Sequence, residues 1–167
     1  SLGRTVDAID EATFFGVRMT KPQRVEAARW IGFENAWPML RTGDPVSSAK
    51  ALEFGLVREE VDGPQVVERA EELVRDAASG KIAFDPIPKD PVPVPDTLPD
   101  VDIGHLSKAI DRILQEATLE GAGMTLDEGL ANEAKKFGEC LETEDMRIGM
   151  ENFLKNGPKV PAEFKHQ

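Results

Sequence analysis

A proline-rich segment in the middle of the chain sets the first limit on its fold. Residues 84–99, FDPIPKDPVPVPDTLP, hold six of the twelve prolines in the sequence. Proline fixes φ and has no amide hydrogen, so a helix cannot continue through this segment. We expect an extended, partly polyproline-II connector that acts as a stiff spacer between two helical halves. A docking site for a proline-recognising module is the alternative interpretation.

The connector divides the chain into three parts, residues 1–83, 84–100 and 101–167. Before it, Pro64 is placed for the first turn of an amphipathic helix with a solvated charged face. The apolar positions that repeat at helical spacing are Val66, Val67, Ala70, Leu73, Val74 and Ala77. After the connector, a second apolar set predicts another helix, which ends at Gly121 and Gly123. Its members are Ile103, Leu106, Ile110, Ile113, Leu114 and Ala117.

Two more helices are expected towards the end of the chain. Thr125 and Glu128 have the spacing of a capping box at the start of the first of them. Thr143 can cap the second, with acidic residues in its first turn. The side chains expected to be buried by this last helix are Met146, Met150 and Phe153.

Composition limits the class of partner and the compartment. The net charge of −11 argues against nucleic acid as a binding partner, because binding a phosphate backbone needs clustered Lys and Arg. A local patch of cations can still bind an anionic small molecule. No apolar run approaches the roughly 20 residues of a membrane span. The chain begins at Ser1 without the pattern of a secretory signal, so we expect a cytoplasmic protein that is processed or excerpted.

The histidines and the single cysteine show no pattern of a reactive or metal site. Cys140 cannot form an internal disulfide, and we interpret it as a small core residue, with a reactive thiol as the alternative. His105 and His166 lie far apart in sequence, and neither belongs to a cluster with metal-ligand spacing. We therefore expect no metal site.

The stretch from residue 39 to 57, MLRTGDPVSSAKALEFGLV, has clear start and stop signals. Gly43 ends an apolar run, and Ser47 can cap a short helix that stops at Gly55. Leu56 and Val57 are expected to begin a short strand. Taken locally, this helix, turn, helix and strand unit is a scaffold without a catalytic side chain.

The order of residues in this stretch resembles a signature in the second half of the enoyl-CoA hydratase/isomerase (crotonase) superfamily. The matching positions are Leu40, Thr42, Gly43, Val46, Ser47, Ser48, Ala51, Leu52, Gly55, Leu56 and Val57. Upstream, residues 29–39 resemble the paired helices that lead into the signature. Downstream, residues 125–137 and 143–154 resemble the family's C-terminal helices.

The resemblance implies a fold and a reaction class. The expected fold is mainly α with short β segments: the C-terminal part of a crotonase-like α/β spiral fold, plus its helical oligomerisation region. In that family, two backbone N–H groups hold the thioester carbonyl oxygen of an acyl-CoA while carboxylates move protons. The amides and the first of two hydratase glutamates come from the N-terminal half, which these residues do not include.

Glu11 is the carboxylate that the resemblance nominates as general acid or base. The family's second glutamate lies in a Pro-Glu pair that precedes an Arg-x-x-Gly pair. Arg29 and Gly32 correspond to the Arg-x-x-Gly pair, and Glu11 falls within one residue of the position of that glutamate. The proline is Asp10 here, and the family's glycine-rich run is replaced by residues 20–24, TKPQR. In an alternative alignment, Glu11 is a solvated surface carboxylate.

The resemblance also implies coenzyme A contacts in the last helix. Phe153 corresponds to an aromatic that helps to hold coenzyme A, often against a neighbouring subunit, and Lys155 or Lys159 corresponds to a cation a few residues later. The spacing differs because Asn156-Gly157-Pro158 interrupts the basic ending. The alternatives are a core or interface aromatic for Phe153 and a helix-end charge for Lys155.

The sequence therefore predicts the C-terminal part, or a separate subunit, of an acyl-CoA enzyme, most simply an enoyl-CoA hydratase. We expect an acyl-CoA substrate, no tightly bound cofactor, an N-terminal crotonase half or second subunit as partner, and a trimeric or hexameric assembly. Isomerase, thioesterase and carbon–carbon hydrolase activities remain open within the superfamily. A non-catalytic assembly subunit is the alternative from a different class.

Overall fold

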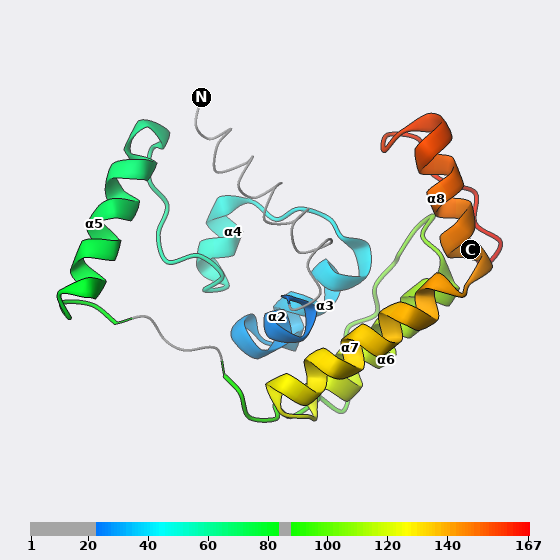
Figure 1. Cartoon of the computed structure of the whole chain (residues 1–167), viewed down its shortest axis with the longest axis horizontal. Coiled ribbons are helices and arrows are strands. Elements are labelled where there is room, and N and C mark those ends of the chain that lie inside the picture. Colours follow the sequence, from blue (N-terminus) through cyan, green and yellow to red (C-terminus); the bar gives the residue numbers. More distant parts are fainter. Residues whose placement is uncertain (1–22, 84–87) are drawn as a thin grey trace.

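The computed structural model describes residues 23–83 and 88–167 (Figure 1). In these ranges the chain forms helices and no strand. The elements are α2 (Gln23–Ile31), α3 (Phe33–Thr42), α4 (Ser48–Glu53), the short 3-10 helix η1 (Gly63–Gln65), α5 (Val66–Ala78), α6 (Lys108–Ala122), α7 (Leu126–Leu141) and α8 (Glu144–Asn156). The mainly α part of the prediction is confirmed. The expected short β segments and spiral do not occur in the described residues.

The pair α2 and α3 holds most of the core. Gly32 separates the two helices at φ 77°, a left-handed conformation that glycine adopts without a steric cost. Trp37 is 2% exposed and Ala36 is fully buried. Ala122 at the end of α6 packs into the same cluster. The paired helices predicted before residue 43 are therefore present, and they bind the second helical half through α6.

The predicted strand at Leu56 and Val57 is wrong. Both backbone N–H groups donate to the carbonyl of Ala51, at 2.8 and 3.3 Å, and so close the end of α4. Gly55 makes this reversal possible with φ 76°. The amides that a strand would use are occupied by the helix cap. The other signals of this stretch are confirmed, since Ser47 Oγ accepts the N–H of Lys50 and α3 ends at Gly43.

The helices α6 and α7 form an antiparallel hairpin (Figure 1). Ser107 caps α6, so Ile103 and Leu106 precede the helix in which they were predicted to lie. The capping box of Thr125 and Glu128 is confirmed at the start of α7. Lys136 Nζ lies 2.7 Å from Glu116 Oε2 and joins the two helices along their length.

The described part of the connector, residues 88–99, is extended but does not hold the two halves apart. Trp37 Nε1 donates to the carbonyl of Pro99 at 3.2 Å. The Val92 N–H donates to Ala122 O at 2.8 Å, and the Leu126 N–H donates to Lys89 O at 2.9 Å. The connector therefore packs against helices on both sides of it, because its prolines leave the remaining amides and carbonyls available to neighbouring helix ends.

Helix α5 lies apart from the other helices (Figure 1). It forms where the apolar spacing predicted it, but Val67 is 70% exposed and Val74 is 66% exposed. No other described helix packs along it; η1 is the element that it contacts. Its apolar face is therefore uncovered by the described residues.

Candidate functional site

Glu11 lies outside the described residues, so its role as general acid or base stays a prediction. The same holds for Asp10 and for residues 20–22, where the sequence departs from the family pattern.

Phe153 and Lys155 both lie in the last turn of α8, and both are exposed. Residues two positions apart on a helix do not face each other. The structure therefore directs the two side chains away from each other, and a single small group cannot contact both on one helix face. Lys159 is exposed beyond the end of α8. The coenzyme A contacts of these residues remain predictions.

The apolar side of α8 is more exposed than its sequence predicts. Met150 is 52%, Phe153 57% and Leu154 80% exposed, so burial of Met150 and Phe153 within this chain is wrong. Figure 1 shows α8 running on beyond the hairpin of α6 and α7, so no helix of the described residues lies beside its second half. The tail after Gly157 returns along α8, with Phe164 against Gly149. Periodicity identified an apolar face but not whether anything covers it.

Among the described residues, the most buried charged group is Asp145, in the first turn of α8, with an exposed fraction of 0%. It accepts hydrogen bonds from Ser107 Oγ and, at 2.9 Å, from the backbone N–H of Lys165. His166 Nδ1 lies 3.2 Å from its Oδ2. This group, called the Asp145 cluster below, joins the starts of α6 and α8 to the tail.

The hydrogen bonds decide the ionisation of Asp145. Burial by itself raises the pKa of a carboxyl because the charged form loses water. In Asp145 the hydrogen bonds from Ser107, Lys165 and His166 outweigh burial and hold the pKa below its usual value. The carboxylate is therefore charged at neutral pH, and its acceptor oxygens are engaged within the protein.

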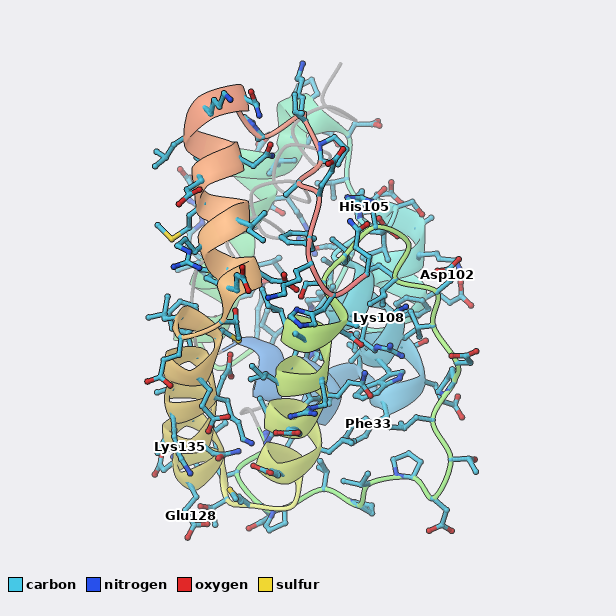
Figure 2. The ribbon with its side chains drawn as sticks, turned by 90° about the vertical axis from the view of Figure 1, so that its right-hand side faces the viewer. Phe33, Asp102, His105, Lys108, Glu128 and Lys135 are labelled. Atoms are coloured by element: carbon cyan, nitrogen blue, oxygen red, sulfur yellow. The ribbon has the colours of Figure 1, made fainter. Side chains whose placement is uncertain are left out.

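Beside this cluster is a hollow of about 650 Å³. Apolar atoms form most of its surface, and basic side chains from the start of α6 and from the tail lie at its wall. The lining residues are Lys108, Ala109, Arg112, Ile113, Thr143, Lys165, His166 and Gln167. We call this hollow the cationic pocket. Figure 2 shows Lys108 at the end of α6 over which the tail passes.

Two carboxylates flank the cationic pocket without lining it. Glu144 Oε2 pairs with Lys165 Nζ, and the hydrogen bond from Lys165 lowers the pKa of Glu144. The same bond raises the pKa of Lys165. Glu116 Oε1 lies 3.4 Å from Arg112 Nε. Lys165 and Arg112 are thus each partly neutralised by a neighbouring carboxylate.

Sequence reasoning did not find the Asp145 cluster or the cationic pocket. Ser107, Asp145 and His166 come from three distant parts of the chain, so no local spacing connects them. The acidic first turn at Thr143 was interpreted as a complement to the helix dipole, which accounts for Glu144 but not for the burial of Asp145. A charged residue in that turn gives no sign of whether another segment covers it.

The described residues contain no group of three or more His, Cys, Asp or Glu side chains placed to hold a metal ion. Within the same ranges, no helix has both the length and the apolar character needed to cross a membrane. Cys140 is half-buried on α7.

Comparison with known proteins finds similarity to the class of enoyl-CoA hydratases. A probable enoyl-CoA hydratase of Bacillus subtilis (strain 168) is 28% identical over 137 residues, which cover 81% of this chain and 43% of that protein. The chain thus spans less than half the length of the curated relative that it matches. No protein-family model matches the chain. No solved structure matches it either.

Proposed function

We propose that this chain is the C-terminal part of an acyl-CoA protein of the crotonase type, most simply an enoyl-CoA hydratase. The observation that carries the proposal is the similarity to a probable enoyl-CoA hydratase over 81% of this chain. In this proposal, a separate N-terminal half supplies the two backbone N–H groups that stabilise the thioester oxyanion. Glu11 then moves a proton as water adds to the α,β double bond.

The exposed apolar faces of α5 and α8 support the idea that a further protein segment or subunit packs against this chain. Large exposed apolar patches mark interaction surfaces in soluble proteins. Here α5 exposes Val67 and Val74, and α8 exposes Met150, Phe153 and Leu154. The proposed role of the chain is to provide helical packing, contacts between subunits and one wall of the coenzyme A site.

The exposure of Phe153 fits a place in that wall. An aromatic ring that is 57% exposed has a free face on which a flat, apolar group can stack. Because Lys155 points to another side of α8, we expect the two residues to contact different parts of the ligand or different subunits.

A second candidate function, a non-catalytic assembly subunit, is favoured by the departures around Glu11. The Pro-Glu pair is Asp10-Glu11 here, and residues 20–24 replace a glycine-rich run. A chain that had kept the packing helices after losing the chemistry would retain the apolar faces of α5 and α8 for the same partner.

Hydration of crotonyl-CoA separates the two candidates. The chain is assayed alone and after co-expression with an N-terminal crotonase half that carries an oxyanion segment. We expect no turnover alone and turnover in the complex, and robust hydration by these residues alone would refute the proposal of a separate half. In the complex, Glu11→Gln should abolish most turnover, while Glu151→Gln, an exposed carboxylate of α8, serves as the control. Unchanged turnover in Glu11→Gln and Phe153→Ala would favour the assembly subunit.

A further inference from the structure

The tail, residues 158–167, returns along α8 and is bonded to both halves of the helix. In the second half, Asn152 Nδ2 donates to the carbonyl of Val160 at 2.7 Å. In the first turn, the Asp145 carboxylate accepts the N–H of Lys165 at 2.9 Å. These contacts follow the tail from the later turns of α8 back to its start. The tail therefore runs antiparallel to the helix.

The residues of α8 that meet the tail share one face of the helix. Asp145, Gly149 and Asn152 are four and then three positions apart, which is the spacing of neighbours on a helix surface. Gly149 lets the tail approach closely, because an added Cβ there would lie 3.3 Å from the ring of Phe164. Phe153 lies at the edge of this face and is exposed. The tail therefore supports α8 without covering Phe153.

The tail is also fixed to the start of α6. The N–H of Lys108 donates to the carbonyl of His166 at 2.7 Å, and Gln167 Nε2 donates to the carbonyl of His105 at 3.2 Å. By contrast, α8 packs on the hairpin of α6 and α7 near its beginning and then runs on without a described helix beside it (Figure 1). Among the described residues, the tail is therefore what connects the second half of α8 to the start of α6.

Asp145 is the point at which α6, α8 and the tail meet. Its buried carboxylate accepts from the Ser107 hydroxyl and from the Lys165 N–H, and His166 Nδ1 lies 3.2 Å from its Oδ2. Both oxygens of an ionised carboxylate only accept, whereas an amide in the same place would turn an NH₂ donor towards one of these donors. The junction therefore requires an acid, and a polar side chain of the same size does not replace it.

We propose that Asp145 is a positioning residue: through the tail it fixes the direction of α8, and with it the place of Phe153. Phe153 lies eight positions beyond Asp145, which is about 12 Å at a rise of about 1.5 Å per residue. A tilt of about 10° at the first turn would move the ring by about 2 Å, a displacement that disrupts a stacking contact. The direction of α8 follows from contacts within this chain, whereas the consequence for a bound acyl-CoA rests on the proposed function.

Residual dipolar couplings of backbone N–H groups test the first part in the full chain, because they report the direction of each helix. In the unmodified chain, one alignment tensor should fit α6, α7 and α8. In Asp145→Asn, the couplings of α8 should no longer fit the tensor of the hairpin. Glu151→Gln removes the same charge from an exposed position of α8, so it is the matched control and should behave as the unmodified chain does.

A chain shortened after Glu163 provides a second variant, which keeps Asp145 and removes the part of the tail that binds it. Its α8 should also depart from the tensor of the hairpin, and circular dichroism verifies that the helices are retained. An α8 that still fits the hairpin in both altered chains would overturn the proposal.

The kinetics of crotonyl-CoA hydration in the active complex test the second part. Asp145→Asn should raise KM by about two- to tenfold with kcat little changed, which is the effect of losing one aromatic contact in binding. Phe153→Ala should raise KM by a similar factor. The two substitutions together should raise it no further, because both remove the same contact. KM factors that multiply in the double variant would overturn the action of Asp145 through Phe153.

The positioning role and the proposed function fail separately. A complex without hydratase turnover, in a chain whose α8 loses its direction in Asp145→Asn, would refute the proposed function and leave Asp145 as the residue that positions α8. Turnover that depends on Glu11, in a complex where Asp145→Asn changes neither the couplings nor KM, would overturn the positioning role and leave the proposed function standing.

Discussion

Replacing Asp145 with alanine should detach the tail from the start of α8 and lower the free energy of unfolding by about 2–4 kcal/mol. Ser107 is 4% exposed, and its hydroxyl would lose its acceptor, which costs about 1–3 kcal/mol for a buried donor. The half-buried N–H of Lys165 would lose a hydrogen bond of 2.9 Å, worth about 1 kcal/mol. The sum of these two terms is the expected loss.

Urea denaturation and amide hydrogen exchange measure the two consequences separately. The Lys165 N–H, which binds Asp145, and the Lys108 N–H, which binds the carbonyl of His166, should lose their protection together. Glu151→Gln, which changes an exposed carboxylate later in α8, is the control and should leave these amides protected. A change in unfolding free energy below about 0.5 kcal/mol, the range of ordinary surface substitutions, with protected tail amides would refute the reasoning.

The pH dependence of the same variant provides an independent check. The pKa of Asp145 is lower in the folded chain than its usual value. Such a carboxyl contributes stability above its unfolded pKa, and that stability is lost as the pH falls through the folded pKa. The unmodified chain should therefore lose tail protection below about pH 4, near the ordinary aspartate value. Asp145→Ala should lack this acid-dependent step, and an identical acid profile in the two proteins would contradict the assignment.

Three further substitutions test the packing, each by urea denaturation. Trp37→Ala should lower the free energy of unfolding by about 3–5 kcal/mol, because the side chain is 2% exposed in the core. A loss below about 1 kcal/mol would contradict its burial. Arg29→Met should lower the free energy of unfolding by about 2–4 kcal/mol, since Arg29 donates to the carbonyls of Gly121 and Met124 near the turn between α6 and α7. An unchanged urea midpoint would mean that water satisfies these carbonyls when the guanidinium is absent. Gly43→Ala should cost about 1–2 kcal/mol because φ is 68° there, whereas Gly138→Ala, in α7, is the matched control because φ is not positive there and an added Cβ meets nothing within 4 Å.

Sequence signals predicted the local features of this chain well. Ser47, Thr125 and Thr143 cap the helices that their positions predicted, because a cap needs only a side-chain oxygen and an amide two or three residues away. Helix type and approximate bounds follow from the same short-range physics. There were two exceptions. Ile103 and Leu106 lie before α6 and not in it. At Leu56 and Val57 a helix cap and a strand compete for the same amides, and residue type alone did not show which would form.

Burial and the candidate site depended on contacts between distant segments. Periodicity identified the apolar faces of α5 and α8, but Val67 and Phe153 are exposed because nothing in the described residues covers them. The Asp145 cluster joins residues 38 and 20 positions apart, which no local pattern encodes.

The sequence by itself determined most of the helices and their caps, the acidic charge of the chain and its similarity to a probable enoyl-CoA hydratase. The tertiary structure alone decided that the connector packs on both helical halves, that Asp145 is buried, and that Lys108, Arg112 and Lys165 line one pocket. The physical reason is range: caps and helical periodicity act within a few residues, whereas desolvation and the potential of a pocket arise from segments that meet only after the chain has folded.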